Sequence, residues 1–155
     1  LCEALEFGIS KWPTAALVYA GGYLARHDAP LRVVQDRIYM RDTKPIDDGI
    51  LDVCEQHGVG FVSFSPLAQG LLTDRYLDSI PCDSRMAQER FLKSETLTPE
   101  LLAQLRAWND EAASEGMTLA EKALRWVLGQ KCVTSVIVGA SSTQQLAVNM
   151  KAAMM

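Results

Sequence analysis

The chain has 155 residues, a net charge of −4 and 48% hydrophobic residues, the composition of about one globular domain. The absence of a basic block argues against nucleic-acid binding, and no apolar run approaches the ~20 residues that a membrane span needs. The four cysteines form no CxxC pair and the two histidines stand near expected helix ends, so we expect free thiols, no metal site and a reducing, cytoplasmic location.

Hydrophobic periodicity and turn residues predict alternating strands and helices along the chain. We expect strands at 4–9, 31–35, 59–64 and 133–139, and helices at 14–26, 44–58, 98–116, 118–130 and 141–154. A long irregular stretch at 66–96 stands between the third strand and the third helix, and loops of that length are usually functional or disordered. The alternation predicts a parallel α/β sheet, either doubly wound or part of a (β/α)8 barrel.

Capping residues define several of the expected helix ends. Gly58 supplies a C-terminal stop for the second helix, and Thr98 can cap the third helix. Thr118 and Glu121 form a capping box at the start of the fourth helix. The apolar stripe that we expect on this helix consists of Ala120, Leu124, Val127 and Leu128.

Polar residues follow the first two expected strands. Ser10 and Lys11 end the first strand in "GISKWP", and Gln35 ends the second. The carboxyl ends of parallel strands are where such sheets bind ligands, and a glutamine amide can both donate to and accept from a ligand amide. The alternatives are that Ser10 caps the helix that follows and that Gln35 is an ordinary surface residue.

The third strand runs directly into "SFSPLAQGLLTDRY". Phe64 offers a flat face for stacking, while Ser65 and the backbone amides of residues 67–70 can surround a pyrophosphate. Arg75 and Arg85, in the long stretch that follows, can supply cations for phosphate groups. The alternative is a proline-turned loop with solvated arginines.

The fourth strand is followed by small polar residues at the start of a helix. Gly139 and the serines Ser141 and Ser142 stand where unpaired backbone N–H groups can bind an anion. Gln145 and Asn149 are four residues apart and share one face of that helix. The alternative is a simple capped helix. Together, polar groups at four strand ends favour a nucleotide-like ligand, although neither GxGxxG nor GxxxxGK[ST] is present.

The segments "GISKWP", "GVGFVSFSPLAQGLLTDRY", "IPCDSRM" and "SVIVGASSTQQLAVNM" together resemble the aldo-keto reductase family over nearly the whole chain. Within it, the chain is most similar to L-glyceraldehyde 3-phosphate reductases, with potassium-channel β-subunits as relatives. The resemblance implies an α/β fold, namely the C-terminal half (strands 5–8) of a (β/α)8 TIM barrel. Residues 1–155 would then be a partial domain that lacks the N-terminal half of the barrel, in keeping with a first residue that is Leu1.

The same resemblance implies a bound NADPH. Ser10 and Gln35 would hold the nicotinamide carboxamide, and Phe64 would stack on the nicotinamide ring. The other residues implied in cofactor binding are Lys11, Ser65, Pro66, Leu67, Ala68, Gln69, Gly70, Arg75, Arg85, Gly139, Ser141, Gln145 and Asn149. Among them, residues 65–69 would line the pyrophosphate, the arginines would lie on a covering loop, and Ser141, Gln145 and Asn149 would lie near the 2′-phosphate and adenine.

The family's catalytic Asp, Tyr, Lys and His belong to the half of the barrel to which nothing in this chain aligns, so we expect no catalytic residue here. The resemblance implies the cofactor-binding half of an NADPH-dependent reductase of aldehydes and ketones, with a small-molecule carbonyl substrate. One alternative is an NADPH-binding regulatory module like a channel β-subunit, and another is a half barrel without a ligand. Unpaired strand edges at 4–9 and 135–138 predict self-association.

Overall fold

The computed structural model describes residues 6–84, 86–88 and 92–154, which fall into two compact units. Unit 1 comprises residues 1–66 and 127–137, and unit 2 comprises residues 67–126 and 138–155.

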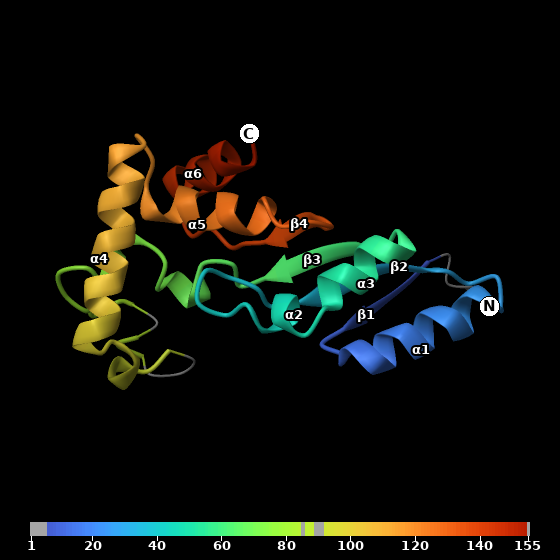
Figure 1. Cartoon of the computed structure of the whole chain (residues 1–155). Coiled ribbons are helices and arrows are strands. Elements are labelled where there is room, and N and C mark those ends of the chain that lie inside the picture. The colour runs from blue at the N-terminus through green and yellow to red at the C-terminus, as the bar shows by residue number, and fades with distance from the viewer. Residues whose placement is uncertain (1–5, 85, 89–91, 155) are drawn as a thin grey trace. The chain divides into compact units, whose positions relative to one another are not determined.

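Unit 1 contains a four-stranded parallel sheet. Its strands are β1 (Phe7–Ser10), β2 (Leu31–Asp36), β3 (Gly60–Phe64) and β4 (Val133–Ile137), and they lie in the order β1-β2-β3-β4 (Figure 1). Each strand therefore pairs with its neighbour in the sequence, whereas a doubly wound sheet reverses its strand order at a switch point. The predicted parallel α/β architecture is confirmed, and the sequential order is consistent with a barrel segment.

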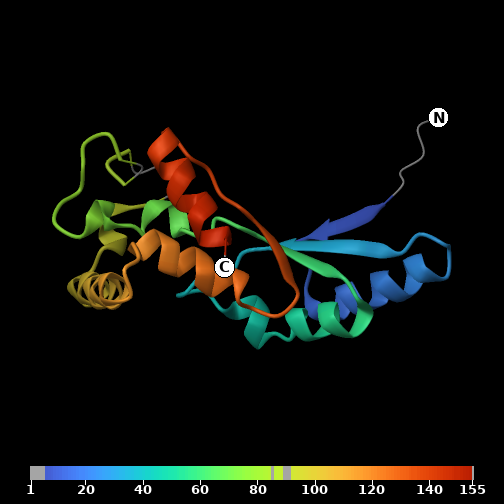
Figure 2. The same cartoon turned by 90° about the horizontal axis from the view of Figure 1, so that it is seen from above.

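The helices of unit 1 are α1 (Thr14–Ala25), α2 (Lys44–Asp47) and α3 (Ile50–His57). Helix α1 packs on β2 and α3, and α3 packs on β3. Figure 2 shows α1 and α3 on the same side of the sheet. The strand side chains buried on that side are those of Val34, Phe61 and Ser63. Because side chains alternate along a strand, Val33, Gln35 and Val62 face the other side.

The predicted helix at 44–58 is wrong as a single helix, because Gly49 divides it into α2 and α3. Gly49 has φ +76°, and its N–H donates to the carbonyl of Ile46 at 2.9 Å. That left-handed conformation costs a glycine little but interrupts a right-handed helix. The Gly58 stop is confirmed, since Gly58 has φ +64° at the end of α3.

Unit 2 contains the irregular stretch and the later helices. Three short 3-10 turns, η1 (Ala68–Gly70), η2 (Asp74–Tyr76) and η3 (Ser94–Thr96), interrupt the stretch that we expected to be irregular. Helix α4 (Pro99–Ser114) follows, and its Arg106 guanidinium donates twice to the Leu77 carbonyl, at 2.7 and 3.2 Å. These bonds attach the long stretch to α4.

Helix α5 (Leu119–Leu128) begins in unit 2 and ends in unit 1, and α6 (Thr143–Ala153) belongs to unit 2. The predicted capping box is confirmed: Thr118 N–H donates to Glu121 at 2.8 Å, and Glu121 N–H donates to the Thr118 hydroxyl at 3.1 Å. The Thr98 cap is confirmed as well, because its hydroxyl accepts from the N–H of Leu101 at 3.3 Å.

Candidate functional site

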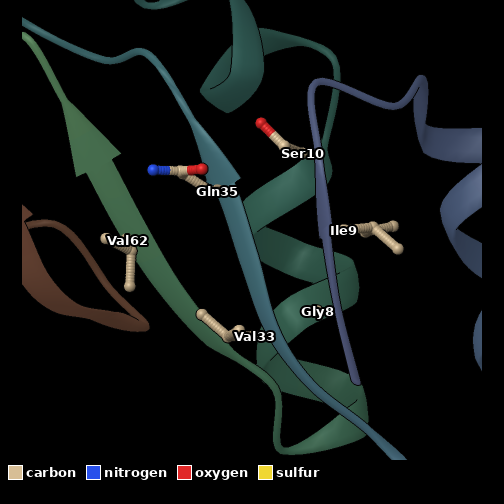
Figure 3. Close-up of a pocket in the computed structure, with 6 residues that line it drawn as sticks. All are labelled: Gly8, Ile9, Ser10, Val33, Gln35 and Val62. Atoms are coloured by element: carbon tan, nitrogen blue, oxygen red, sulfur yellow. The ribbon is translucent and has the colours of Figure 1, made fainter. Parts of the chain in front are cut away.

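The carboxyl ends of β1 and β2 place two polar side chains next to each other. Ser10 and Gln35 are register partners on neighbouring strands, and both lie on the sheet side opposite α1 and α3 (Figure 3). A pocket of about 340 Å³ lies there, at the lower end of the range for small-molecule sites. Its lining residues are Gly8, Ile9, Ser10, Val33, Gln35 and Val62.

Both polar side chains in this pocket are available for a ligand. Within the part of the chain that the structure describes, neither the Ser10 hydroxyl nor the Gln35 amide has a hydrogen-bond partner. A hydroxyl and an amide together can satisfy the donor and the acceptor of a ligand carboxamide. The donor set therefore fits the nicotinamide end of a dinucleotide. The alternative role of Ser10 as a helix cap is wrong, because Pro13 occupies the N-cap of α1.

Gly8 makes room for this arrangement. A Cβ atom at position 8 would lie 2.6 Å from Cγ1 of Val33, which is too close for two carbon atoms. The absence of a side chain at Gly8 therefore lets β1 lie close to β2 where the pocket forms, next to a shift in strand register between Phe7 and Gly8. Sequence reasoning missed Gly8, Val33 and Val62 as lining residues, although the two-residue alternation with Ser10 and Gln35 would have placed them on the same face.

The end of β3 holds Phe64 next to the same strand ends. Lys11, directly after β1, donates its N–H to the Gln35 carbonyl at 2.9 Å and places its ammonium nitrogen 5.7 Å from the centre of the Phe64 ring. One residue earlier on β3, the buried Ser63 hydroxyl donates to the carbonyl of Ile38 at 3.0 Å and accepts from its N–H at 3.3 Å. This pair of bonds fixes the end of β3 to the loop after β2.

Backbone strain gathers at the predicted ligand-binding segments. Six described residues other than glycine have positive φ, and four of them are Lys11 (60°), Ser65 (51°), Ala68 (48°) and Gln69 (64°). Each such residue costs roughly 1–2 kcal/mol relative to the right-handed conformation. Strain of this kind clusters at functional sites, where the surroundings enforce it. The observation is independent of side-chain chemistry and points to the same strand ends.

The 67–70 segment in unit 2 forms a tight left-handed turn. The N–H groups of Gly70 and Leu72 donate to the Leu67 carbonyl at 2.9 and 3.2 Å, and the N–H of Leu71 donates to Ala68 at 3.2 Å. Leu71 and Leu72 are buried and anchor the turn. The Gly70 amide is thus already used within the turn, which narrows the expected pyrophosphate-binding amides to residues 67–69.

Arg75 lies in unit 2 close to this turn in the sequence. Its guanidinium pairs with Asp83 at 2.8 Å, and its buried Nε has no hydrogen-bond partner among the residues that the structure describes. Because the Asp83 side chain is 75% exposed, the pair contributes at most about 1 kcal/mol and a phosphate can compete for the guanidinium. Asp83 was not anticipated from the sequence. The other predicted cation, Arg85, lies outside the described residues.

The segment between β4 and α6 brings its predicted residues together, but they bind one another. The Gln145 amide oxygen accepts from the N–H of Ser141 at 2.8 Å and from its hydroxyl at 3.0 Å. Asn149 donates to the Gly139 carbonyl at 3.5 Å, and Ser142 caps the helix by accepting from the N–H of Gln145. An anion at this segment would have to displace Gln145 from Ser141.

Residues 6–84, 86–88 and 92–154 contain no group of three or more His, Cys, Asp and Glu side chains that could hold a metal ion. None of the helices described there has the length and apolar character required to cross a membrane.

Residues 3–155 match the profile of the aldo/keto reductase family. The chain belongs to this family. It is 39% identical over 154 residues to the L-glyceraldehyde 3-phosphate reductase of Escherichia coli O157:H7, covering 97% of this chain and 44% of that protein. It is also 33% identical over 153 residues to a probable voltage-gated potassium channel subunit beta of Arabidopsis thaliana, covering 96% and 47%.

Among solved structures, the chain resembles the thermostable aldo-keto reductase Tm1743, crystallised with the inhibitor epalrestat, with a TM-score of 0.67 and 23% identity. The match covers 97% of this chain and 43% of that one, and it shows the fold alone. The chain therefore has an aldo-keto reductase fold and spans a little under half the length of the curated relatives it matches. The resemblance inferred from the sequence is confirmed.

Proposed function

We propose that this chain is the cofactor-binding part of an NADPH-dependent oxidoreductase that reduces aldehydes or ketones to alcohols. Membership of the aldo/keto reductase family supports an oxidoreductase. The observation that carries the proposal is the juxtaposition of Ser10 and Gln35, both without partners among the described residues, at one pocket on the open side of the sheet. We further propose that the chain forms strands 5–8 of a (β/α)8 barrel in the cytoplasm.

The division of roles follows from the residues that are present. NADPH, when bound, supplies a hydride to the carbonyl carbon of a small-molecule substrate. In unit 1, Ser10 and Gln35 hold and orient the carboxamide, and Phe64 provides the stacking face. In unit 2, the 67–69 amides and Arg75 bind phosphate groups, and Ser141, Gln145 and Asn149 contact the adenosine end. The proposal assigns no general acid to this chain.

A titration of NADPH fluorescence with the purified chain tests the proposal. Ser10→Ala and Gln35→Leu each remove one hydrogen-bonding group from the pocket and should weaken binding about five- to tenfold, the equivalent of 1–1.5 kcal/mol per hydrogen bond. Ser135→Ala is the matched control, because Ser135 is an exposed strand serine of the same sheet that does not line the pocket. Equal affinities for all four proteins, or no binding at millimolar NADPH, would refute the assignment.

A second candidate is an NADPH-binding regulatory module that acts through a partner protein. The observation in its favour is the 33% identity to a plant potassium channel subunit beta over 96% of this chain. Both candidates require cofactor binding, so the titration does not separate them. A reductase assay with a generic aldehyde does, when this chain is joined to a barrel half that supplies the general acid: turnover then supports the enzyme, and tight NADPH binding without turnover supports the module.

A further inference from the structure

Lys11 stands at the centre of the proposed nicotinamide end of the site. It follows Ser10 directly, and its N–H is bound to the carbonyl of Gln35 at 2.9 Å. The backbone at Lys11 is left-handed, with φ 60°, directly after β1. The ammonium nitrogen of Lys11 lies 5.7 Å from the centre of the Phe64 ring, although Phe64 belongs to a different strand end.

The positive charge of Lys11 is not neutralised nearby. Across residues 6–84, 86–88 and 92–154, no carboxylate lies within 4 Å of its ammonium group. Two other cations nearby in the sequence are paired: Arg37 contacts Asp42 at 2.6 Å, and Lys44 contacts Asp48 at 2.5 Å. Lys11 therefore contributes a net positive charge to the space above Phe64.

We infer that Lys11 makes this site prefer the reduced nicotinamide cofactor over the oxidised one. The inference rests on the proposed function, since it places the nicotinamide ring on Phe64. The oxidised ring carries a positive charge and the reduced ring is neutral, so an ammonium group beside it repels only the oxidised form. Attraction of Lys11 to the cofactor phosphates is common to both forms and cancels in the ratio of their dissociation constants.

The size of the preference follows from the charge separation. The ammonium group lies over the Phe64 ring, 5.7 Å from its centre, so a nicotinamide stacked there would displace it to the ring edge, for which we take a charge separation of about 7 Å. With an effective dielectric constant between that of water and half that value, the repulsion weakens binding of the oxidised form about three- to eightfold relative to the reduced form. The exposure of Lys11 to solvent places the effect at the lower end.

This preference would serve a reductase directly. After the reaction the site holds the oxidised cofactor, and the charge of Lys11 would speed its departure. The site would also fill with the reduced form when both forms are present at equal concentration. Lys11 is thus a residue that sets cofactor specificity, while the hydrogen bonds of Ser10 and Gln35 are the same in the two forms.

The test measures the dissociation constants of NADPH and NADP⁺, by fluorescence and by calorimetry, for the full chain and its variants. Lys11→Met keeps the length of the side chain and removes the charge. The dissociation constant of NADP⁺ divided by that of NADPH should therefore fall about three- to eightfold. Lys11→Arg keeps the charge and should keep the ratio. Phe64→Leu removes the stacking face and should weaken both forms while the ratio stays within twofold.

Ionic strength provides a second readout. Raising the salt from 0.01 to 1 M shortens the screening length from about 30 to 3 Å, so the wild-type ratio should approach that of Lys11→Met. If Lys11 only supported Phe64 structurally, Lys11→Met would change both dissociation constants by the same factor. Their ratio and its salt dependence would then stay unchanged. Binding of both forms with an unchanged ratio in Lys11→Met would overturn the inference alone. Failure of the wild-type chain to bind either form would overturn the proposed function and the inference with it.

Discussion

Glu121 is a carboxylate that is only 2% exposed, and Lys151 is the cation beside it. One Glu121 oxygen accepts from the N–H of Thr118, and the other lies 2.8 Å from the ammonium nitrogen of Lys151. That second contact has the distance of a hydrogen bond without its ideal angles, so we treat it as an ion pair. Replacing Lys151 with methionine removes the cation and leaves the buried carboxylate with one backbone donor.

The expected loss follows from the burial of the two groups. A hydrogen bond to a charged group contributes about 1.5–3 kcal/mol to stability. Because the Lys151 side chain is 61% exposed, solvent screens part of the attraction. We therefore expect Lys151→Met to lower the free energy of unfolding by about 1–2 kcal/mol at pH 7.

The pH dependence identifies the charge pair as the cause. The Lys151 ammonium, followed by the Thr118 N–H, holds the pKa of Glu121 below its usual value. A lowered pKa in the folded state adds stability above the unfolded value of about 4.3, and this stability is lost as the pH falls through the folded pKa. The difference between wild type and Lys151→Met should thus be complete at pH 7 and should shrink as the pH falls below about 4.

Urea denaturation at pH 7 and pH 3 measures this difference. Lys93→Met is the matched control, because Lys93 is exposed and has no carboxylate within 4 Å among the described residues. In a Glu121→Gln background, Lys151→Met should change the free energy of unfolding by no more than about 0.5 kcal/mol, because the carboxylate that pairs with Lys151 has been removed. An equal loss at both pH values, or a loss no larger than that of Lys93→Met, would refute the reasoning.

Three further substitution or labelling experiments and one association measurement test other features. Asp28 has φ 53° after α1, so Asp28→Gly should raise the free energy of unfolding by about 0.5–1 kcal/mol in urea. Ser63→Ala leaves the N–H and carbonyl of Ile38 without their buried partner and should cost about 1–3 kcal/mol in the same assay. Burial raises the pKa of Cys54 to about 11, so a thiol reagent at pH 8 should label the exposed Cys82 quickly and Cys54 only after unfolding. The open edges of β1 and β4 should make the chain self-associate, as light scattering would show.

Each of these expectations has a clear contrary result. Destabilisation by Asp28→Gly would mean that the aspartate side chain contributes more than its strain costs. A neutral Ser63→Ala would show that the loop after β2 is held by other contacts. Labelling of Cys54 as fast as Cys82 would show that the side of the sheet covered by α3 opens freely. A monodisperse monomer with a cooperative thermal transition would contradict the association.

Local signals predicted the helix starts well, because a cap depends on neighbouring residues. The hydroxyls of Thr98 and Thr118 accept the backbone bonds that their positions indicated. The stripe of α5 was predicted less well. Its fully buried residues include Leu119 and Ala123, whereas Ala120 is only half-buried. Which neighbouring turn of a helix faces the core depends on the elements packed around it, and the sequence of the helix alone does not contain that information.

The division of the 44–58 helix shows a different limit. The sequence "IDDG" is compatible with a continuous helix that contains one weak residue. In the structure, Thr43 donates to Asp47 and Lys44 pairs with Asp48, so side chains around Gly49 stabilise the end of a short first helix. These side-chain contacts stabilise the interrupted helix only when Gly49 has its left-handed conformation. The sequence alone does not show that Gly49 adopts it.

The candidate site also has features that the sequence predicts and features that it does not. From the sequence alone, strand alternation and the position of strand ends place Ser10, Gln35 and Phe64 at one edge of a sheet. The approach of Lys11 to Phe64 could not be predicted, because it depends on a left-handed backbone at Lys11 that lysine seldom adopts. The hydrogen bond from Ser141 to Gln145 could not be predicted either, because it depends on the rotamer of the Gln145 side chain.

The left-handed turn at 68–70 decides which substitutions that segment can accept. Ala68, Gln69 and Gly70 have φ values of 48°, 64° and 96° in succession. β-Branched residues are the least tolerant of this region, so a library that varies these positions should lose valine, isoleucine and threonine during selection for folded protein. Asparagine and glycine should rise in frequency at the first two positions, whatever ligand the chain binds. The residues enriched at this turn would then reflect the backbone conformation. Their enrichment would not indicate that they contact a ligand.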